Sequence, residues 1–285
     1  MAELFKGAPV AKAITERNKQ ELEELTSKGI TPTLAIVRLG EKPGDLSYER
    51  GALKRAEKTG VQVRQFVFPE DMTAEALLAE IEKINQDSGI HGVLMFRPLP
   101  KHINEKAVCE ALAPEKDMDG ITSGSMAGVF MDTGIGYPPC TAEAVMEMLD
   151  HYGVELKGKK TTVFGRSLVI GKPVAMMLMA RHATITVCHS RTRSEDFAEA
   201  GKGADIVVTA LGRAKMIGAD TLGENQIIID VGINVDEEGN LCGDVDFDAA
   251  EPKTAAITPV PGGVGSVTTA VLMKHVIQAA GKTAK

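Results

Sequence analysis

The sequence predicts an α/β protein built from two domains. Short apolar runs typical of buried strands alternate with helical patterns along the chain, which indicates parallel sheets covered by helices. At 285 residues, the chain has room for about two domains. With 44% hydrophobic and 25% charged residues, its composition is that of a globular protein able to bury a large core. We place the division near residue 145, where a second alternating series begins.

The first series alternates three helices with three strands. Residues 8–28 carry a helical pattern that stops at Gly29, and a second helix is expected over 46–58, stopped by Gly60. A third helix, Thr73–Gln86, has a capping threonine at its start. The strands expected in this half are Thr33–Val37, Val61–Phe68 and Gly92–Phe96.

The second series begins after an expected helix at Thr141–Tyr152. Its last strand is expected at Ala255–Ile257, and a final helix follows from about Gly265. The pattern of that helix allows it to pack on either half of the chain. The strands expected before these last two elements are Thr161–Phe164, Thr184–Cys188, Asp205–Thr209 and Ile227–Val231.

Charge and composition exclude several classes of function. The formal net charge of −7 argues against non-specific binding to nucleic acid or to an anionic membrane. No apolar run approaches the roughly 20 residues of a membrane span, and the amino terminus lacks the long apolar segment of a signal peptide. The histidines show no HExxH-like spacing, and the four cysteines form no CxxC pair, which indicates reduced thiols. We therefore expect a cytoplasmic protein without a metal site.

The most informative stretch is the loop Thr258–Gly265. Two prolines fix φ and remove backbone donors, while three glycines let the backbone come close to a ligand. The loop leads into the apolar run Thr269–Met273, which reads as the start of a helix. A rigid loop with a bare backbone before a helix suits an anion or a flat polar ring. A purely structural turn is the alternative for such a loop seen alone.

A second candidate loop, Gly165–Pro173, follows the first strand of the second series. It takes the place of the Rossmann glycine loop, but it is not GxGxxG, so the standard fingerprint fails. One glycine, Gly165, still follows the strand, and another, Gly171, opens the helix. Arg166 and Ser167 can offer charge-assisted and hydroxyl hydrogen bonds to a phosphate. We interpret this loop as a dinucleotide-binding loop.

The end of the next strand favours NADP over NAD. NAD-specific Rossmann enzymes usually place an acidic residue there to bind the ribose hydroxyls, whereas this chain has Ser190. Together with Arg166, Ser190 fits a 2′-phosphate, although an exposed polar loop explains the same residues. The later strands end at Gly212 and at Gly232 and Ile233, and the strand ends of such a sheet converge on a ligand.

Taken together, these segments resemble the methylenetetrahydrofolate dehydrogenase/cyclohydrolase family (FolD-type). The matching blocks span nearly the whole chain in the family's order. They are Pro98–Pro100, Lys116–Gly120, Pro139–Thr141, Gly165–Ser167, Gly171–Pro173, Cys188–Ser190, Asp230–Asn234, Gly243–Val245 and Thr258–Gly265.

The resemblance implies a fold, a cofactor and an assembly. The fold is two α/β domains with a cleft between them. An amino-terminal folate-binding catalytic domain spans residues 1–145, and the final helix, 266–285, is able to pack on it. A Rossmann domain that binds NADP spans 146–265. Tetrahydrofolate derivatives are the implied substrates, and the implied assembly is a homodimer.

The resemblance also assigns the folate side of the site. Tyr48 corresponds to the tyrosine that stacks on the folate ring, and Asp119 to the aspartate that binds the amino-imino edge of the pterin. A carboxylate that faces adjacent N–H donors accepts two hydrogen bonds. Further folate contacts fall on Pro98, Leu99, Pro261, Gly262 and Gly263. Without the family context, Tyr48 could be helix core and Asp119 a turn or capping residue.

Two positions depart from the family pattern. The family has a lysine four residues after the tyrosine, for cyclohydrolase chemistry, where this chain has Ala52. It usually has a glutamine two residues before the Pro-Leu-Pro, where this chain has Phe96. Lys54 points about 240° from Tyr48 around the helix, and Arg55 lies roughly 10 Å further along the axis. An arginine is also a poor base, so neither residue is a convincing replacement.

These departures predict the loss of one activity. Hydride transfer from the methylene carbon to a nicotinamide needs mainly two rings in near-attack geometry. Hydrolysis of the methenyl product needs an activated water, for which acid–base help is worth roughly 10²–10⁴-fold. We therefore expect an NADP-dependent methylenetetrahydrofolate dehydrogenase of one-carbon metabolism with weak or absent cyclohydrolase activity. The alternatives are a bifunctional enzyme in which another group replaces the lysine, a shikimate-type dehydrogenase, and a non-catalytic dinucleotide sensor.

Overall fold

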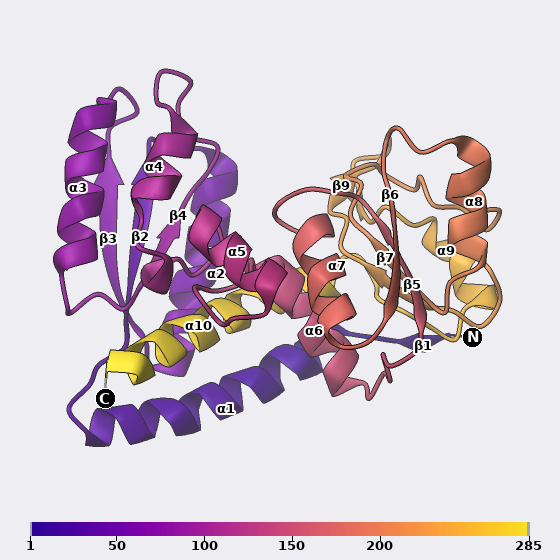
Figure 1. Cartoon of the computed structure of the whole chain (residues 1–285), viewed down its shortest axis with the longest axis horizontal. Coiled ribbons are helices and arrows are strands. Elements are labelled where there is room, and N and C mark those ends of the chain that lie inside the picture. The colour runs from indigo at the N-terminus through magenta and orange to yellow at the C-terminus, as the bar shows by residue number, and fades with distance from the viewer. Residues whose placement is uncertain (1, 284–285) are drawn as a thin grey trace. The chain divides into compact units, whose positions relative to one another are not determined.

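A computed structural model describes residues 2–283 (Figure 1). The described residues divide into two compact units, which confirms the predicted two-domain α/β fold. One unit, here called the Rossmann unit, contains residues 2–11 and 141–268. The other, here called the three-stranded unit, contains residues 12–140 and 269–283.

The three-stranded unit is built on a parallel sheet with the strand order β3-β2-β4. Strand β2 is buried along its whole length, which agrees with the apolar run Leu34–Val37 at its centre. Helices α3 and α4 cover one face, where Val37 packs in a buried core with Leu77, Ile81 and Val108. Its strands are β2 (Thr33–Leu39), β3 (Gln62–Phe68) and β4 (Gly92–Met95). Helices with residues in this unit are α1 (Gly7–Ser27), α2 (Pro43–Thr59), α3 (Ala74–Gln86), α4 (Glu105–Ala111), α5 (Ser123–Met131) and α10 (Thr268–Thr283).

The Rossmann unit is built on a six-stranded parallel sheet with the order β1-β11-β8-β7-β5-β6. Phe164, Val207 and Ile228 lie at the centre of its core. Its strands are β1 (Glu3–Leu4), β5 (Lys160–Phe164), β6 (Thr184–Cys188), β7 (Ile206–Thr209), β8 (Ile227–Asp230) and β11 (Ala256–Ile257), with a separate antiparallel pair of β9 (Asn234–Val235) and β10 (Leu241–Cys242). Its helices are α6 (Cys140–His151), α7 (Gly171–Ala180), α8 (Ser194–Lys202) and α9 (Phe247–Ala250).

Both ends of the described chain make contacts that the sequence patterns left undecided or did not indicate. Strand β1, next to the amino terminus, pairs with β11 in the Rossmann sheet. Helix α10 packs in the three-stranded unit, where Asn18 Nδ2 donates to the carbonyl of Ala270 at 3.1 Å. Thr73 caps α3 as expected, because its side chain accepts a hydrogen bond from the backbone N–H of Ala76.

Candidate functional site

The strand order places a ligand crevice at the carboxyl edge of the Rossmann sheet. The chain leaves β5 for β6 on one side, and β7 pairs with β5 on the other. A crevice forms where neighbouring connections diverge in this way, and ligands of open α/β sheets bind there. The loops that follow β5, β6, β7 and β8 meet at this edge, so the predicted cofactor residues on these loops are brought to one side of the sheet.

The loop between β5 and α7 has the close backbone packing of a dinucleotide loop. Gly165 has φ 129°, and a Cβ there would overlap the carbonyl oxygen of Ala210 at the end of β7. Gly165 is therefore required for the two loops to approach each other. Ser167 Oγ accepts a hydrogen bond from the backbone N–H of Ile170 at 3.1 Å, just before α7 begins at Gly171. Arg166 is exposed.

A cavity of about 660 Å³ opens beyond the ends of β6 and β7. Ser190, His189, Leu211 and Arg213 are among its lining residues. The ring of His189 accepts a hydrogen bond from the backbone N–H of Arg191 at 3.1 Å, so this histidine shapes the turn after β6. The glycine loop and this cavity lie at the same edge of the sheet, and a pocket of this size at that edge fits a dinucleotide such as NADP.

Two buried carboxylates hold the loops of this edge together, and Asp230 is the first. It accepts hydrogen bonds from Thr209 Oγ1 at 2.9 Å and from the backbone N–H of Gly232 at 2.9 Å. It also accepts from the backbone N–H groups of Asp244 and Val245, at 3.1 and 2.9 Å. These four donors tie the ends of β7 and β8 to the segment after β10.

Asp244 is the second buried carboxylate, and it fixes the loop after β7. It accepts hydrogen bonds from the backbone N–H groups of Leu211, Gly212 and Arg213, at 2.5, 3.3 and 2.9 Å. Asn234 Nδ2 donates to the same carboxylate at 2.9 Å. The loop that carries Gly212 is therefore held at three successive amides. We call Asp230 and Asp244 the carboxylate clasp.

The clasp depends on a glycine that lies between the two chain segments. A Cβ at Gly243 would overlap the carboxylate of Asp230. Sequence reasoning matched Asp230 and Asp244 to family motifs without assigning them a role. The signal was present in the glycines beside them, because Gly232 donates to Asp230 and Gly243 lets its carboxylate approach.

We expect Asp230 to make the folded chain less stable as the pH rises from about 4 to about 6. Burial raises the pKa of its carboxyl to about 6 from an ordinary 3.8, so in this range the folded chain holds a proton that the unfolded chain has released. By linkage, the free energy of unfolding then falls with rising pH, by about 3 kcal/mol in total. Urea unfolding of the wild type and Asp230→Asn across this range measures the effect. Across this pH range, the free energy of unfolding of the wild type should fall by this amount relative to that of Asp230→Asn. If the two free energies change in parallel with pH, the raised pKa of Asp230 is contradicted.

The proline-glycine loop lines a smaller cavity, of about 270 Å³, together with the end of β8. Pro261, Gly262 and Gly263 lie on one side of it, and Gly232 and Ile233 lie on the other. The loop is anchored from the amino terminus, because the backbone N–H of Gly7 donates to the carbonyl of Gly262 at 2.8 Å. The structure thus brings predicted folate residues and predicted cofactor residues to one cavity within the Rossmann unit.

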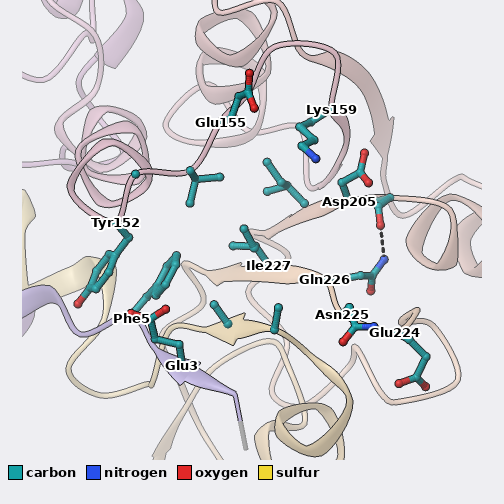
Figure 2. Close-up of a pocket in the computed structure, with 16 residues that line it drawn as sticks. Glu3, Phe5, Tyr152, Glu155, Lys159, Asp205, Glu224, Asn225, Gln226 and Ile227 are labelled. Atoms are coloured by element: carbon teal, nitrogen blue, oxygen red, sulfur yellow. Dashed lines mark hydrogen bonds between the residues drawn. The ribbon is translucent and has the colours of Figure 1, made fainter.

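A further cavity of about 450 Å³ lies at the opposite, amino-terminal edge of the Rossmann sheet (Figure 2). The stacked rings of Phe5 and Tyr152, with centroids 4.0 Å apart, line it together with Lys159 and Asp205. Because ligands of such sheets bind beyond the carboxyl ends of the strands, we do not place the cofactor there.

In the three-stranded unit, Tyr48 and Phe96 form an aromatic pair. Their ring centroids are 5.9 Å apart and the rings meet edge to face, at 81°. Phe96 directly follows β4, and its backbone N–H donates to the carbonyl of Val37 on β2. Ala52, one turn after Tyr48 on α2, is fully buried. The two positions that depart from the family pattern therefore both lie beside Tyr48, and both carry apolar side chains.

The nearby cations on or next to α2 are exposed or engaged elsewhere. Lys54 is exposed. The guanidinium of Arg55 donates to Thr15 Oγ1 at 3.1 Å and to Thr269 Oγ1 at 3.3 Å, and its partial burial lowers its pKa. Lys42, at the start of α2, donates to the carbonyl of Pro98 at 2.5 Å. Lys42 thus joins α2 to the Pro98–Leu99 loop that was predicted to contact folate.

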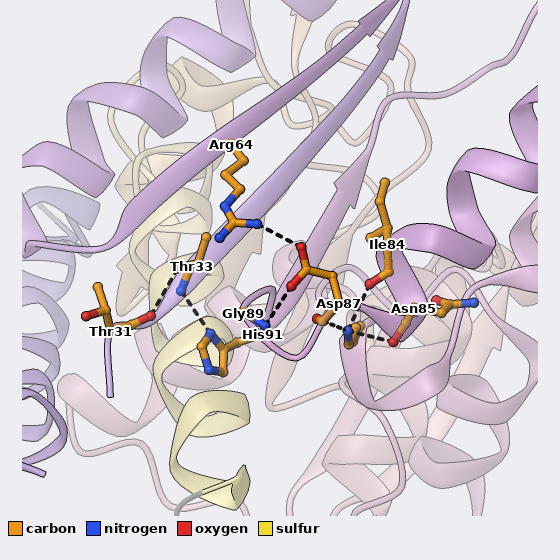
Figure 3. A network of polar contacts seen from close by, with 9 residues as sticks. Thr31, Thr33, Arg64, Ile84, Asn85, Asp87, Gly89 and His91 are labelled. Carbon is orange, nitrogen blue, oxygen red and sulfur yellow. Dashed lines mark hydrogen bonds and ion pairs between the residues drawn. The ribbon is translucent and has the colours of Figure 1, made fainter. Parts of the chain in front are cut away.

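The segment that carries Asp119 is anchored at its start by Lys116. The amine of Lys116 donates to the carbonyls of Ile84, Asn85 and Asp87, at 2.9, 2.8 and 2.7 Å, and Figure 3 shows these three residues around the end of α3. A lysine that bonds the last carbonyls of a helix stabilises that end. The segment Lys116–Gly120 is therefore anchored to the end of α3, within the three-stranded unit, at its first residue.

Asp117 and Asp119 have opposite environments. Asp117 is fully buried and accepts hydrogen bonds from the backbone N–H groups of Ile121 and Thr122, at 3.0 and 2.8 Å. Asp119 accepts one from the backbone N–H of Cys140 at 3.0 Å. Desolvation raises the pKa of the Asp119 carboxyl. A carboxylate that is desolvated but receives few donors from the chain is suited to bind donors from a ligand.

The part of the chain that the structure describes contains neither a cluster of metal ligands nor a membrane-spanning helix. Among residues 2–283, no group of three or more histidine, cysteine or acidic side chains is arranged to hold a metal ion. No helix within these residues combines the length and the apolar character that crossing a bilayer requires.

Comparisons with known proteins agree with this geometry. Residues 5–119 match the family model for the tetrahydrofolate dehydrogenase/cyclohydrolase catalytic domain, and residues 139–284 match the model for the NAD(P)-binding domain of the same family. The bifunctional protein FolD of Clostridioides difficile is 49% identical over 277 residues, which cover 97% of this chain and 96% of the relative.

Solved structures give the same result. The bifunctional FolD methylenetetrahydrofolate dehydrogenase/cyclohydrolase of Campylobacter jejuni superposes with a TM-score of 0.95 at 34% identity, over 99% of this chain and 100% of that one. The Trypanosoma brucei dehydrogenase-cyclohydrolase, solved with NADP and an inhibitor, superposes with a TM-score of 0.92 at 35% identity, over 99% and 98% of the two chains.

Proposed function

The chain belongs to the tetrahydrofolate dehydrogenase/cyclohydrolase family, and from this premise we propose that it oxidises 5,10-methylenetetrahydrofolate to 5,10-methenyltetrahydrofolate with NADP and hydrolyses the product weakly or not at all. The family resemblance inferred from the sequence is confirmed, since the two family models together match most of the chain. The Clostridioides difficile and Campylobacter jejuni relatives are called bifunctional. The single-activity proposal therefore rests on the residues of this chain.

The observation that carries the proposal is the apolar pair of departures beside Tyr48. Ala52 is fully buried and Phe96 packs edge to face against the Tyr48 ring. Neither side chain can hold or transfer a proton. Asp119, by contrast, retains a carboxylate with capacity for further donors. The substrate-binding groups are present while the groups assigned to water activation are absent.

The residues of this chain have distinct tasks in the proposed reaction. Tyr48 stacks on the folate ring, and Asp119 accepts hydrogen bonds from the amino-imino edge of the pterin, which orients the ring. Lys42 holds the Pro98 loop by donating to its carbonyl. The carboxylate clasp fixes the loops that line the cofactor side. Bound NADP supplies the acceptor for a hydride. No strong protein base is needed, because the folate nitrogen lone pair expels the hydride.

We expect Ser190→Asp to weaken the use of NADP selectively. A carboxylate at the end of β6 repels a 2′-phosphate and suits the ribose hydroxyls of NAD. The expected result is a fall in kcat/KM for NADP of about 10²-fold, with a smaller change or a gain for NAD. Steady-state kinetics with both nicotinamides provide the measurement. Thr184→Asp, at the exposed far end of the same strand, is the matched control. Equal losses with both cofactors would contradict the assignment of Ser190.

The proposed dehydrogenase activity has a direct test. Purified protein is incubated with methylenetetrahydrofolate and NADP, and the absorbance of NADPH is followed. We expect saturable turnover that requires both substrates. A non-catalytic dinucleotide sensor would bind NADP without turnover, and a shikimate-type dehydrogenase would not turn over the folate substrate.

A bifunctional enzyme is the second candidate, and one contact favours it. The amine of Lys42 lies against the Pro98 loop, 2.5 Å from its carbonyl oxygen, so Lys42 is the cation that the structure places on predicted folate-binding backbone. If hydrolysis of the methenyl product is observed, Lys42→Met should abolish it while the oxidation continues with a raised folate KM, because the Pro98 loop loses its donor. A proportional fall of both activities would instead limit Lys42 to loop positioning.

Several expectations stay proposals. They are a homodimeric assembly, a cytoplasmic location, and functional domain limits of 1–145 and 146–265. The preference for NADP over NAD rests on Arg166 and Ser190, which follow adjacent strands.

A further inference from the structure

The carbonyl of Met118 receives two buried donors from distant parts of the chain. His275 Nδ1, on α10, lies 2.8 Å from the Met118 oxygen. Cys140 Sγ, at the first residue of α6, lies 3.2 Å from the same oxygen. Met118 and His275 are fully buried, and Cys140 is 1% exposed. A carbonyl accepts but cannot donate, so Nδ1 of His275 carries a proton in this arrangement.

The geometry of this carbonyl determines the geometry of Asp119. The Met118 carbonyl and the Asp119 N–H belong to one planar peptide group, so fixing the oxygen fixes the rotation of that plane and the N–Cα bond on which the Asp119 side chain is carried. Cys140 acts at a second point, because its backbone N–H donates to Asp119 Oδ1 at 3.0 Å. The carboxylate predicted to bind the pterin edge is thus held through its backbone and through one oxygen.

We propose that His275 is a positioning residue for substrate binding, acting through the Met118 carbonyl on Asp119; this role rests on the function proposed above. Bidentate recognition of two adjacent N–H groups is sensitive to small rotations of the carboxylate. Without the imidazole donor, the buried carbonyl keeps the weaker thiol donor of Cys140, so the peptide plane is held less tightly. The affinity for folate should then fall, whereas the cofactor residues on the Rossmann sheet, which belong to the other unit, are untouched.

A purely structural role for His275 makes a different prediction. Its ring also lies 5.0 Å from the ring of Tyr137, so its removal lowers the packing of α10 in any case. A packing defect reduces stability and the active fraction, but it leaves the KM for the folate unchanged. The ratio of folate KM to NADP KM therefore distinguishes the two roles.

The experiment compares variants of the full chain by steady-state kinetics and thermal unfolding. His275→Leu removes the donor, and His275→Asn keeps an N–H donor at a position close to that of Nδ1. Val276→Ala, on the same buried helix, is the matched control that loses packing without touching the Met118 carbonyl. We expect His275→Leu to raise the KM for methylenetetrahydrofolate about tenfold with little change in the KM for NADP. His275→Asn should restore most of this loss, and Val276→Ala should lower stability with an unchanged folate KM.

The possible failures are distinguishable. Should His275→Leu match Val276→Ala, with lower stability and an unaltered folate KM, the positioning role is overturned while the proposed function stands. Absence of turnover in the wild type overturns the proposed function, and the positioning role with it. If His275→Leu does not fold, Cys140→Ala removes the second donor to the same carbonyl with a smaller loss of volume. Its folate KM should rise, and an unchanged value would overturn the proposal.

Discussion

Replacing Asp119 by asparagine should remove most of the dehydrogenase activity and leave the folded chain at least as stable at neutral pH. Burial raises the pKa of this carboxyl, which means that folding disfavours its charged form. A neutral amide relieves that cost. The amide cannot accept two charge-assisted hydrogen bonds from the pterin edge, so we expect kcat/KM for the folate to fall about 10²-fold or more. Steady-state kinetics and urea unfolding at neutral pH measure the two effects.

Asp117 provides the matched control, because it lies two residues away and has the opposite role. Its carboxylate accepts hydrogen bonds from two backbone N–H groups, so Asp117→Asn should reduce the free energy of unfolding by about 1–3 kcal/mol. The folded fraction of Asp117→Asn should have a kcat/KM for the folate closer to that of the wild type than Asp119→Asn has. If Asp119→Asn destabilises the chain as much as Asp117→Asn while retaining activity, Asp119 is a structural residue and its assigned role is wrong.

Restoring the family residues at both positions, with Ala52→Lys and Phe96→Gln, should create hydrolysis that neither single substitution produces. Ala52→Lys alone introduces an amine at a fully buried position beside an aromatic pair, so it should lower stability and add little activity. Adding Phe96→Gln supplies a polar neighbour. For the double variant we expect enzyme-dependent hydrolysis of methenyltetrahydrofolate to rise by up to roughly 10²–10⁴-fold. The decay of the methenyl absorbance band in the presence and absence of each variant measures this gain.

Ala52→Lys combined with Phe96→Leu is the control for this gain. It removes the aromatic ring beside Tyr48 but adds no amide. If this control hydrolyses the product as fast as the glutamine variant, space rather than orientation limits the lysine. If neither double variant hydrolyses the product while both keep dehydrogenase activity, the proposed loss of cyclohydrolase activity is not explained by these two positions.

The sequence predicted most of the sheet strands because their apolar runs are long and bounded by glycine or polar residues. Strands β5 and β6 lie within a residue of the expected ranges. The short β1 was not predicted, because its two residues, Glu3 and Leu4, carry no period and its partner β11 lies more than 250 residues away in the chain. Helix α5 was missed for a local reason. Its sequence SGSMAGVFM contains two glycines and has no clear apolar face.

For the candidate site too, some features could be predicted from the sequence and others could not. The sequence patterns placed Gly165 and Ser190 just after strands, and the structure finds both residues there. The contacts that hold these loops were not predictable, because each joins residues far apart in the sequence. The bonds from Asp244 to the loop after β7 and from His275 to Met118 are examples. Sequence motifs therefore indicate candidate ligand-binding residues on loops, but they do not indicate the distant residues that hold those loops in place.

We propose that this chain forms methenyltetrahydrofolate and hydrolyses it weakly or not at all. The most direct measurement adds synthetic methenyltetrahydrofolate to the wild-type protein and follows its absorbance beside a protein-free sample in the same buffer. The same preparation is shown to be active by NADPH formation from methylenetetrahydrofolate. We predict that the decay with protein equals or only slightly exceeds the decay without it. A protein-dependent decay as fast as the NADPH formation of the same preparation would contradict the claim and show the enzyme to be bifunctional.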